Sequence, residues 1–319
     1  MTQISIVTAG IDTSKHKLDV AIPAQAKLWQ VENTQAGWQN LARQLMQAGV
    51  GRIGIEPSGG YQRAVVTQLR AAGFEVLLLQ PMQVRAFAKV HRRRAKNDTL
   101  DAVLIAECAA TMPPPRVKSD PRLEDLALEM TFLEQTEEDL NRLKVRLEHA
   151  TARQCAIITA DIKLLKKRRN AEIARIRAAL QAYPDLAKRF ALVCSIPGIG
   201  ERTALAIVVR MPELGQLTRE EAAALAGLAP FDDDSGQRHG HRHIAGGRAR
   251  LRRSLYAAAL AASSRWNAAL VVLYRRLKAA GKPHKAALVA CARKLIIYAN
   301  TVVQRGTPWT DQPTTATTK

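Results

Sequence analysis

A stretch without glycine or proline constrains the fold of this chain more than any other feature. Neither residue occurs from 122 to 183, so no helix breaker interrupts that segment. Leucine recurs every seven residues within it, at Leu126, Leu133, Leu140 and Leu147. Such a repeat is typical of coiled coils. We expect a long helix or a helical hairpin as a coiled-coil linker at 116–183, which either packs within its own domain or mediates self-association.

Positive charge is concentrated in the C-terminal half of the chain. The 319 residues include 48 Lys and Arg against 28 Asp and Glu, a net charge of +20. Residues 1–150 contain 19 basic and 17 acidic residues, whereas residues 151–319 contain 29 and 11. This excess argues against an ordinary neutral metabolic enzyme and indicates a polyanionic partner. Aromatic residues make up only 4%, which favours contacts to backbone phosphates over base stacking.

The sequence shows no pattern typical of a membrane span, a signal peptide or a set of disulfide bonds. No apolar run approaches the ~20 residues that a membrane span needs, and the N-terminus lacks the pattern of a signal peptide. We expect a cytoplasmic protein without a membrane partner, associated with the nucleoid when active. The four cysteines lie far apart in the sequence, at Cys108, Cys155, Cys194 and Cys291. This spacing predicts buried, reduced thiols and argues against a zinc site or a disulfide framework.

The first 80 residues alternate short apolar runs with turn residues. Strands are predicted at 4–11, 18–22, 27–32, 52–56 and 74–79, and helices at 35–48 and 61–72. This order indicates an α/β domain, at 1–115, whose sheet opens with an antiparallel meander. A further helix is expected at 99–110, before the prolines at 113–115.

Four carboxylates stand at the ends of these elements. Asp12 lies at the end of the first strand, Glu56 ends the fourth, and Asp98 and Asp101 share one face of the next helix. Each alone has a structural explanation, as a turn former, a loop anion or a helix cap. If the first and fourth strands are neighbours, as in an RNase H-like order, the four converge. Four converging carboxylates require divalent cations, as in two-metal phosphoryl-transfer sites.

The segment at 184–306 is rich in Ala and Leu and is expected to be helical, followed by a disordered tail at 307–319. Its sequence Ile-Pro-Gly-Ile-Gly at 196–200 is typical of a helix-hairpin-helix turn, in which Gly198 and Gly200 expose amides to a phosphate. Further on, Ser235 precedes a glycine in an arginine-rich loop and is a candidate nucleophile. The neighbouring His239, His241 and His243 are interpreted as phosphate contacts or exposed residues rather than metal ligands.

Basic side chains in several clusters are candidates for nucleic-acid binding. They are Arg92, Arg93, Arg94, Lys166, Lys167, Arg168, Arg169, Arg238, Arg242, Arg248, Arg252 and Arg253.

In order and spacing, these blocks resemble the DEDD-type transposases of insertion sequences, which are bridge-RNA-guided recombinases. The resemblance covers nearly the whole chain. It rests on Gly-Ile-Asp-Thr-Ser-Lys at 10–15, Ile-Glu-Pro-Ser-Gly at 55–59, Lys-Asn-Asp-Thr-Leu-Asp-Ala at 96–102, and the blocks at 196–200, 226–230, 235–236 and 251–256. The loop after Ser235 is richer in His and Arg than the family pattern.

The resemblance implies a RuvC-like, RNase H-like N-terminal domain, a coiled-coil link and a helical transposase domain. It implies that Asp12, Glu56, Asp98 and Asp101 hold Mg²⁺, with Mn²⁺ as a possible substitute. It also implies that Ser235 forms a covalent phosphoserine intermediate with DNA. The implied partners are double-stranded donor and target DNA, a noncoding guide RNA and further copies of the chain, from dimer to tetramer.

Two other functions fit the residues. A junction-resolving, metal-dependent nuclease would use the carboxylates and water, with Ser235 as a turn residue. A nonenzymatic nucleic-acid scaffold would use only the basic half. Retained cleavage after Ser235→Ala would favour the first, and indifference to both Asp12→Ala and Ser235→Ala the second.

Overall fold

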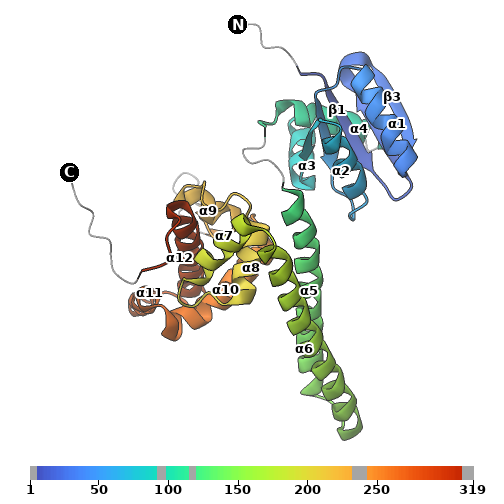
Figure 1. Ribbon diagram of the computed structural model, residues 1–319. Coiled ribbons are helices and arrows are strands. Elements are labelled where there is room, and N and C mark those ends of the chain that lie inside the picture. Colours follow the sequence, from blue (N-terminus) through green and yellow to red (C-terminus); the bar gives the residue numbers. More distant parts are fainter. Residues whose placement is uncertain (1–5, 92–97, 115–119, 232–242, 311–319) are drawn as a thin grey trace, which may run out of the picture. The chain divides into compact units, whose positions relative to one another are not determined.

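A computed structural model describes residues 6–91, 98–114, 120–231 and 243–310; for residues 98–100 only the backbone is described. The chain divides into two compact units, Met1–Arg116 and Val117–Lys319 (Figure 1). Each unit has its own hydrophobic core.

The first unit is built on a mixed five-stranded sheet. Its strands are β1 (Thr8–Thr13), β2 (Lys17–Ile22), β3 (Lys27–Glu32), β4 (Arg52–Glu56) and β5 (Glu75–Leu78). The strand order is β3-β2-β1-β4-β5. β1, β2 and β3 form an antiparallel meander, while β4 runs parallel to β1 and β5 parallel to β4. The expected α/β domain with an antiparallel opening is therefore confirmed.

Helices cover both faces of this sheet (Figure 1). Helices α1 (Gln35–Gln47) and α2 (Arg63–Ala71) lie on one face, where their apolar residues form a core with Ile11, Ile53 and Ile55. Helix α4 (Asp98–Thr111) covers the other face and contacts β1, β2 and β4. Helix α3 (Pro81–Val90), which the sequence analysis did not predict, packs beside α4.

Two glycines allow α4 to lie directly on the strands. Gly10 and Gly54 are paired in the register of β1 and β4. A Cβ atom on Gly10 would lie 2.0 Å from the Ala102 carbonyl oxygen, and one on Gly54 would lie 2.6 Å from Ala109 Cβ. Only glycine permits this approach.

The buried Arg52, at the start of β4, fixes the other end of α4. Its Nη1 donates to the Ala109 and Met112 carbonyl oxygens, at 3.3 and 2.8 Å. Its guanidinium also pairs with Glu75, with Nε 3.0 Å from Oε2. Since the last turn of α4 lies at the start of β4, the helix runs antiparallel to β1 and β4. Its first turn therefore lies toward their C-terminal ends.

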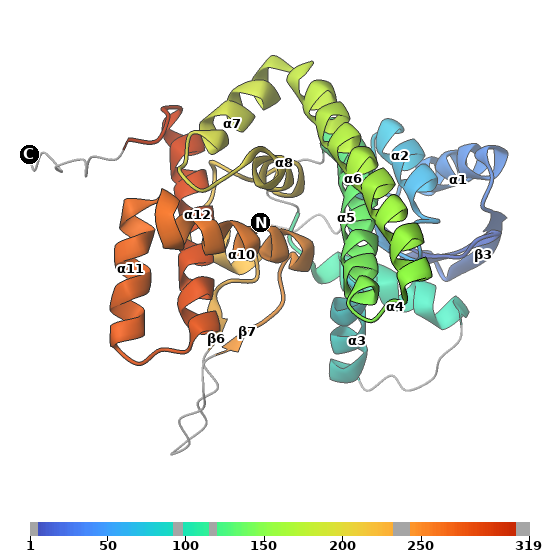
Figure 2. The same cartoon turned by 90° about the horizontal axis from the view of Figure 1, so that it is seen from below.

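The second unit begins with an antiparallel hairpin of two long helices, α5 (Pro121–Leu147) and α6 (Ala152–Gln181), which lie side by side in both views (Figures 1 and 2). The chain turns at 148–151, where Thr151 and Gln154 form a capping box that starts α6. The heptad residues Leu126 and Leu133 belong to the core of the helical unit. Near the turn, Val145, Ile157 and Leu164 are exposed. The proximal half of the hairpin thus packs within its own unit.

The remainder of the second unit is helical, as expected. It contains α7 (Pro184–Cys194), α8 (Glu201–Arg210), α9 (Arg219–Leu225), α10 (Ala249–Ala261), a π-helical turn (Ala262–Trp266), α11 (Ala268–Ala279) and α12 (His284–Arg305). A short hairpin of β6 (Pro230–Phe231) and β7 (His243–Ile244) lies between α9 and α10 in the sequence (Figure 2).

Among the described helices, α12 alone is long and apolar enough to cross a membrane, with a mean hydropathy of 1.5 over its most apolar window. Half of that window is buried inside the unit. Leu288, Leu295 and Ile296 are fully or almost fully buried, and the latter two belong to the core. This burial is typical of a core helix. Length and hydropathy alone are weak evidence for a membrane-spanning helix.

Three expectations are corrected by the structure. The first strand spans Thr8–Thr13 rather than 4–11. Within the segment expected to be a disordered tail, Trp309 packs against Tyr298 and its backbone N–H donates to Ser195 Oγ at 2.8 Å. All four thiols are free, but only Cys108 and Cys291 are buried. Cys155 and Cys194 are half-buried, and burial raises the pKa of both Cys194 and Cys291 to about 11.

Candidate active site and nucleic-acid interface

Asp12 and Glu56 lie directly opposite each other on neighbouring strands. The parallel register pairs Asp12 of β1 with Glu56 of β4. Side chains alternate between the two faces of a strand, so Asp12 shares a face with Gly10, and Glu56 with Gly54. That face is the one that α4 covers. The strand adjacency on which the predicted carboxylate site depends is therefore present.

Helix α4 brings a third carboxylate toward this edge of the sheet. Asp101 is half-buried in the first turn of α4. It immediately precedes Ala102, whose carbonyl oxygen lies against Gly10. Asp98 is the first residue of α4, but its side chain lies outside the described part. The structure thus places Asp12, Glu56 and Asp101 on elements that meet on one face of the sheet.

The loops beside these carboxylates are held by side-chain hydrogen bonds. Thr13 Oγ1 donates to the Glu56 carbonyl oxygen at 3.2 Å. Asn33 Nδ2 donates to the carbonyl oxygens of Ser14 and Tyr61, at 2.8 and 3.2 Å, and so joins the loops that follow β1 and β4. Gly60, with φ +96°, makes the turn after β4. These contacts fix the backbone on both sides of the carboxylate pair.

The donor chemistry of this edge suits a hard divalent cation, which prefers carboxylate oxygens. Within the described residues, however, no group of three or more Asp, Glu, His or Cys side chains stands in a metal-binding arrangement. Asp98 is not among these residues, because its side chain is not described. The residues present fit the type of ligand that Mg²⁺ or Mn²⁺ takes, while a closed coordination shell is not formed by the described side chains.

Several predicted site residues lie outside the described residues. They are Ser235, Arg92, Arg93, Arg94, Arg238, Arg242, His239 and His241. His243 is exposed in β7.

The predicted helix-hairpin-helix turn at 196–200 packs against the π-helical turn. Gly198 has φ +92°, and a Cβ atom there would lie 2.4 Å from Ala262 Cβ. Asn267 Nδ2 donates to the Pro197 carbonyl oxygen at 3.2 Å. Gly198 therefore has a packing role that the sequence did not indicate. Gly200 is exposed as the N-cap of α8, and a phosphate contact there stays a prediction.

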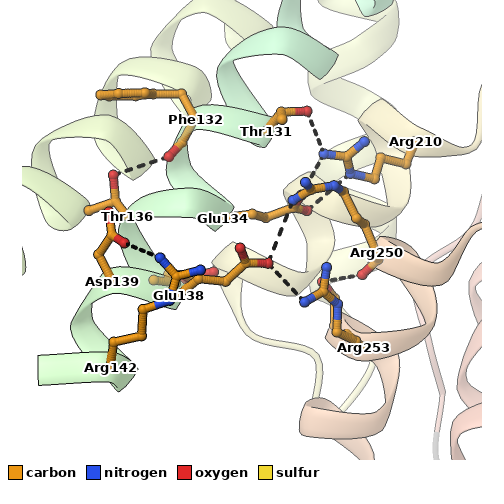
Figure 3. A network of polar contacts seen from close by, with 12 residues as sticks. Thr131, Phe132, Glu134, Thr136, Glu138, Asp139, Arg142, Arg210, Arg250 and Arg253 are labelled. Carbon is orange, nitrogen blue, oxygen red and sulfur yellow. Dashed lines mark hydrogen bonds and ion pairs between the residues drawn. The ribbon is translucent and has the colours of Figure 1, made fainter. Parts of the chain in front are cut away.

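Acidic residues of α5 neutralise arginines of α8 and α10 (Figure 3). Glu134, of which only 6% is exposed, accepts from Arg210 Nη2 at 2.7 Å and from Arg250 Nη1 at 2.9 Å. Glu138 accepts from Arg253 Nη1 at 2.9 Å. Glu137, one turn along α5 from Glu134, accepts from Arg202 Nη2 at 2.7 Å. These contacts join the hairpin to the helical part of the same unit.

Two other arginines predicted to bind phosphate also hold the unit together. Arg248 pairs bidentately with Glu213, at 2.7 and 2.9 Å. Burial raises the pKa of Glu213, but the hydrogen bonds and charge of Arg248 outweigh that effect and the net pKa is lowered. Arg252 Nη1 donates to the carbonyl oxygens of Gly246 and Gly227, at 2.7 and 3.2 Å. Arg253 remains the most open of the three, with 60% of its side chain exposed.

The basic residues of α6 have a different environment. Lys166, Lys167 and Arg168 are exposed. Arg169 is half-buried and its Nη2 donates to Asn170 Oδ1 at 2.9 Å. Three adjacent cations are thus presented to solvent on one helix.

The α5 network was missed by the sequence analysis, which did not consider Glu134, Arg202 or Arg210. A signal was present, because Glu134, Glu137 and Glu138 have the i, i+3, i+4 spacing of one helix face. The opposing arginines come from residues 202–253, and spacing alone does not reveal such distant partners.

Comparison with known proteins adds sequence relationships to this geometry. Two family models match the chain: a DEDD transposase model of the IS110 group, described as "Transposase", over residues 9–156, and "Transposase IS116/IS110/IS902 family" over residues 190–275. Together they cover the sheet, α5 and most of the helices that follow α6.

Two similar proteins match almost the whole chain, and a third matches about half of it. The "Pilin gene-inverting protein" of Moraxella bovis is 26% identical over 312 residues, covering 94% of this chain and 96% of that protein. Its Moraxella lacunata counterpart is 25% identical over the same extent. An insertion element IS110 protein of 43.6 kDa from Streptomyces coelicolor is 31% identical over 47% of this chain and 36% of that protein. The chain therefore belongs to the IS110 family of DEDD transposases and is a DNA transposase or recombinase.

Proposed function

We propose that this protein catalyses RNA-guided DNA strand cleavage and exchange for an insertion sequence. In this proposal Asp12, Glu56, Asp98 and Asp101 hold Mg²⁺, for which Mn²⁺ can substitute, and Ser235 is the nucleophile. The observation that carries the proposal is the in-register pairing of Asp12 with Glu56 beneath the first turn of α4. The strand order β3-β2-β1-β4-β5 also supports an RNase H-like, RuvC-like fold for residues 1–115.

The proposed reaction is a transesterification at phosphorus. The Ser235 hydroxyl loses its proton as its oxygen bonds to the phosphorus, and one P–O bond to a sugar breaks. The departing sugar oxygen takes up a proton, and the DNA is left esterified to the serine. A divalent cation bound by the carboxylates would stabilise the negative charge that develops on the phosphate oxygens. Attack by a sugar hydroxyl of another strand then rejoins the DNA and releases the serine.

The proposed partners follow from charge and family. Donor and target DNA and a guide RNA are polyanions, and the C-terminal half has the excess positive charge to bind them. If a guide RNA selects the DNA sequence by base pairing, the protein needs positive charge and a complementary shape rather than side chains that read bases. We place the protein in the cytoplasm near the nucleoid, as a dimer to tetramer in which residues 116–183 link the sheet domain to a transposase domain at 184–306. The two Moraxella relatives are named as gene-inverting proteins, and inversion of a gene requires rejoining of strands rather than simple hydrolysis.

A covalent adduct would test this mechanism directly. The protein is incubated with Mg²⁺, the RNA transcribed from its element end, and labelled donor and target DNA, and the products are separated on a denaturing gel. We expect a protein–DNA adduct that disappears in Ser235→Ala and in Asp12→Asn. The matched control is Ser264→Ala, because Ser264 is an exposed serine whose hydroxyl donates only to the Ala261 carbonyl oxygen among the described contacts.

Cleaved DNA without an adduct would overturn the serine mechanism and identify water as the nucleophile. An adduct that persists in Ser235→Ala would show that another residue attacks. Adduct formation that is unchanged in Asp12→Asn would remove the carboxylate site from the reaction.

A further inference from the structure

A further acidic side chain, outside the four predicted carboxylates, lies beside the Asp12–Glu56 pair. The antiparallel register of β1 and β2 places Asp19 directly opposite Asp12. Side chains of residues paired in this way point to the same face of the sheet. Asp19, Asp12 and Glu56 therefore form one row across β2, β1 and β4, on the face that α4 covers.

Asp19 is buried and both of its oxygens are engaged. It is only 5% exposed. Gln30 Nε2, from the paired position on β3, donates to Oδ1 at 2.6 Å. Lys17 Nζ, two residues earlier on the same face of β2, lies 3.2 Å from Oδ2. A carboxylate with a donor on each oxygen is held in one orientation.

Asp19 also faces the beginning of α4. It lines a pocket together with Leu28, Trp29, Gln30 and Ala102. Ala102 directly follows Asp101 in the first turns of α4. The pocket therefore places Asp19 next to the helical turn that contains Asp101, and the strand register places it opposite Asp12.

This row is unfavourable for the sheet itself. Like charges directly opposite each other on adjacent strands destabilise a sheet, and at Asp19 the ion pair with Lys17 and the hydrogen bond from Gln30 offset part of this cost. An asparagine would occupy the position of Asp19 with the same shape, accept the bond from Gln30 and carry no charge. A buried charge in such a position is the kind of local conflict that proteins retain at functional sites.

We propose that Asp19 is a positioning residue for Asp12 in the carboxylate site. Its fixed negative charge repels the Asp12 carboxylate from the β2 side and directs it toward Glu56 and Asp101. It also adds to the negative potential that attracts a divalent cation. The inference rests on the proposed metal site, and Asp19 itself acts through Asp12.

Mn²⁺ binding tests this role without recourse to activity. The free Mn²⁺ signal in electron paramagnetic resonance is measured while wild-type protein, Asp19→Asn and Asp19→Glu are titrated into Mn²⁺. We expect the Mn²⁺ dissociation constant of Asp19→Asn to rise by roughly tenfold to a hundredfold, the usual effect of losing a residue that orients a metal ligand. Asp19→Glu, which keeps the charge, should recover part of the affinity. Gln30→Leu, on an exposed position of β3, should weaken binding by a smaller factor.

The matched control is Glu75→Gln. It removes the partner of Arg52 in the same sheet, at the opposite ends of the strands, and should lower thermal stability without changing Mn²⁺ affinity. Unchanged affinity in Asp19→Asn, while Asp12→Asn abolishes saturable binding, would overturn the positioning role alone. Absence of saturable binding in the wild type, or its persistence in Asp12→Asn, would overturn the metal site from which the inference starts.

Discussion

Glu134 is the residue whose environment most strongly constrains substitution in the helical unit. Its carboxylate is almost fully buried and lies within 4 Å of guanidinium groups of Arg202, Arg210 and Arg250. We expect Glu134→Ala to lower the free energy of unfolding by about 3–5 kcal/mol, because removing one partner of a buried ion pair leaves the opposite charges uncompensated. Urea unfolding followed by circular dichroism measures this change.

Glu138 is the matched control for Glu134, one helical turn away on the same face of α5. It pairs with Arg253, but 36% of its side chain and 60% of that of Arg253 are exposed. Solvent screens such pairs, so Glu138→Ala should cost no more than about 1 kcal/mol. Equal losses in the two variants would show that burial does not govern the network.

At the scale of elements, the contact of α4 with the sheet positions the carboxylates. We expect Gly10→Ala to lower stability by about 1–3 kcal/mol, since the new methyl group must displace the α4 backbone at Ala102 and Ala106. The same displacement moves Asp101, so Mn²⁺ affinity should fall as well. Thermal unfolding and Mn²⁺ titration of the same samples report the two effects.

Gly51→Ala controls for the loss of a glycine in the same unit. Its Cβ would approach only the Ile6 Cγ2 atom, at 3.0 Å, among the described neighbours, and a side-chain end can move aside. A Gly10→Ala protein that binds Mn²⁺ as tightly as Gly51→Ala does would show that the position of α4 is not critical for the site.

The sequence predicts the elements of this site better than their arrangement. Apolar runs and turn residues place Asp12 and Glu56 at strand ends, because local patterns reflect which face of a strand is buried. Whether β1 and β4 are neighbours depends on long-range pairing, which the motif alone does not determine. The carboxylate site therefore remained conditional until the register was known.

The roles of Gly198 and Asp19 could not be predicted from the sequence. The turn at 196–200 has the glycines of a phosphate-binding loop, yet the atom that excludes a side chain at Gly198 belongs to Ala262, far along the chain. Asp19 is an unremarkable polar residue within a strand until the antiparallel register places it opposite Asp12. Both roles arise from tertiary contacts, which residue spacing does not encode.

For the whole molecule, the question is which of its many basic residues meet nucleic acid. The net charge of +20 predicts binding that weakens steeply with salt, because each neutralised phosphate releases counterions. Many arginines of the second unit are instead paired with its own carboxylates, as Arg248 is with Glu213. Net charge alone therefore overstates the surface available to phosphates. The exposed fraction of each side chain distinguishes basic residues that are open to nucleic acid from those paired within the unit.

We expect the exposed cations of α6 to contribute to the salt dependence and Arg248 not to. Replacing Lys166, Lys167 and Arg168 by Gln should make the slope of log K against log salt concentration shallower, by up to about 0.9 for each lost duplex contact. Arg248→Met should leave that slope unchanged while lowering the free energy of unfolding, because Glu213 then loses its partner in a half-buried position. Filter binding to a duplex of arbitrary sequence at several salt concentrations measures the slopes. If Arg248→Met changed the slope and the α6 variant did not, the nucleic-acid surface would lie at the start of α10, and the Arg248–Glu213 pair would have to open when DNA binds.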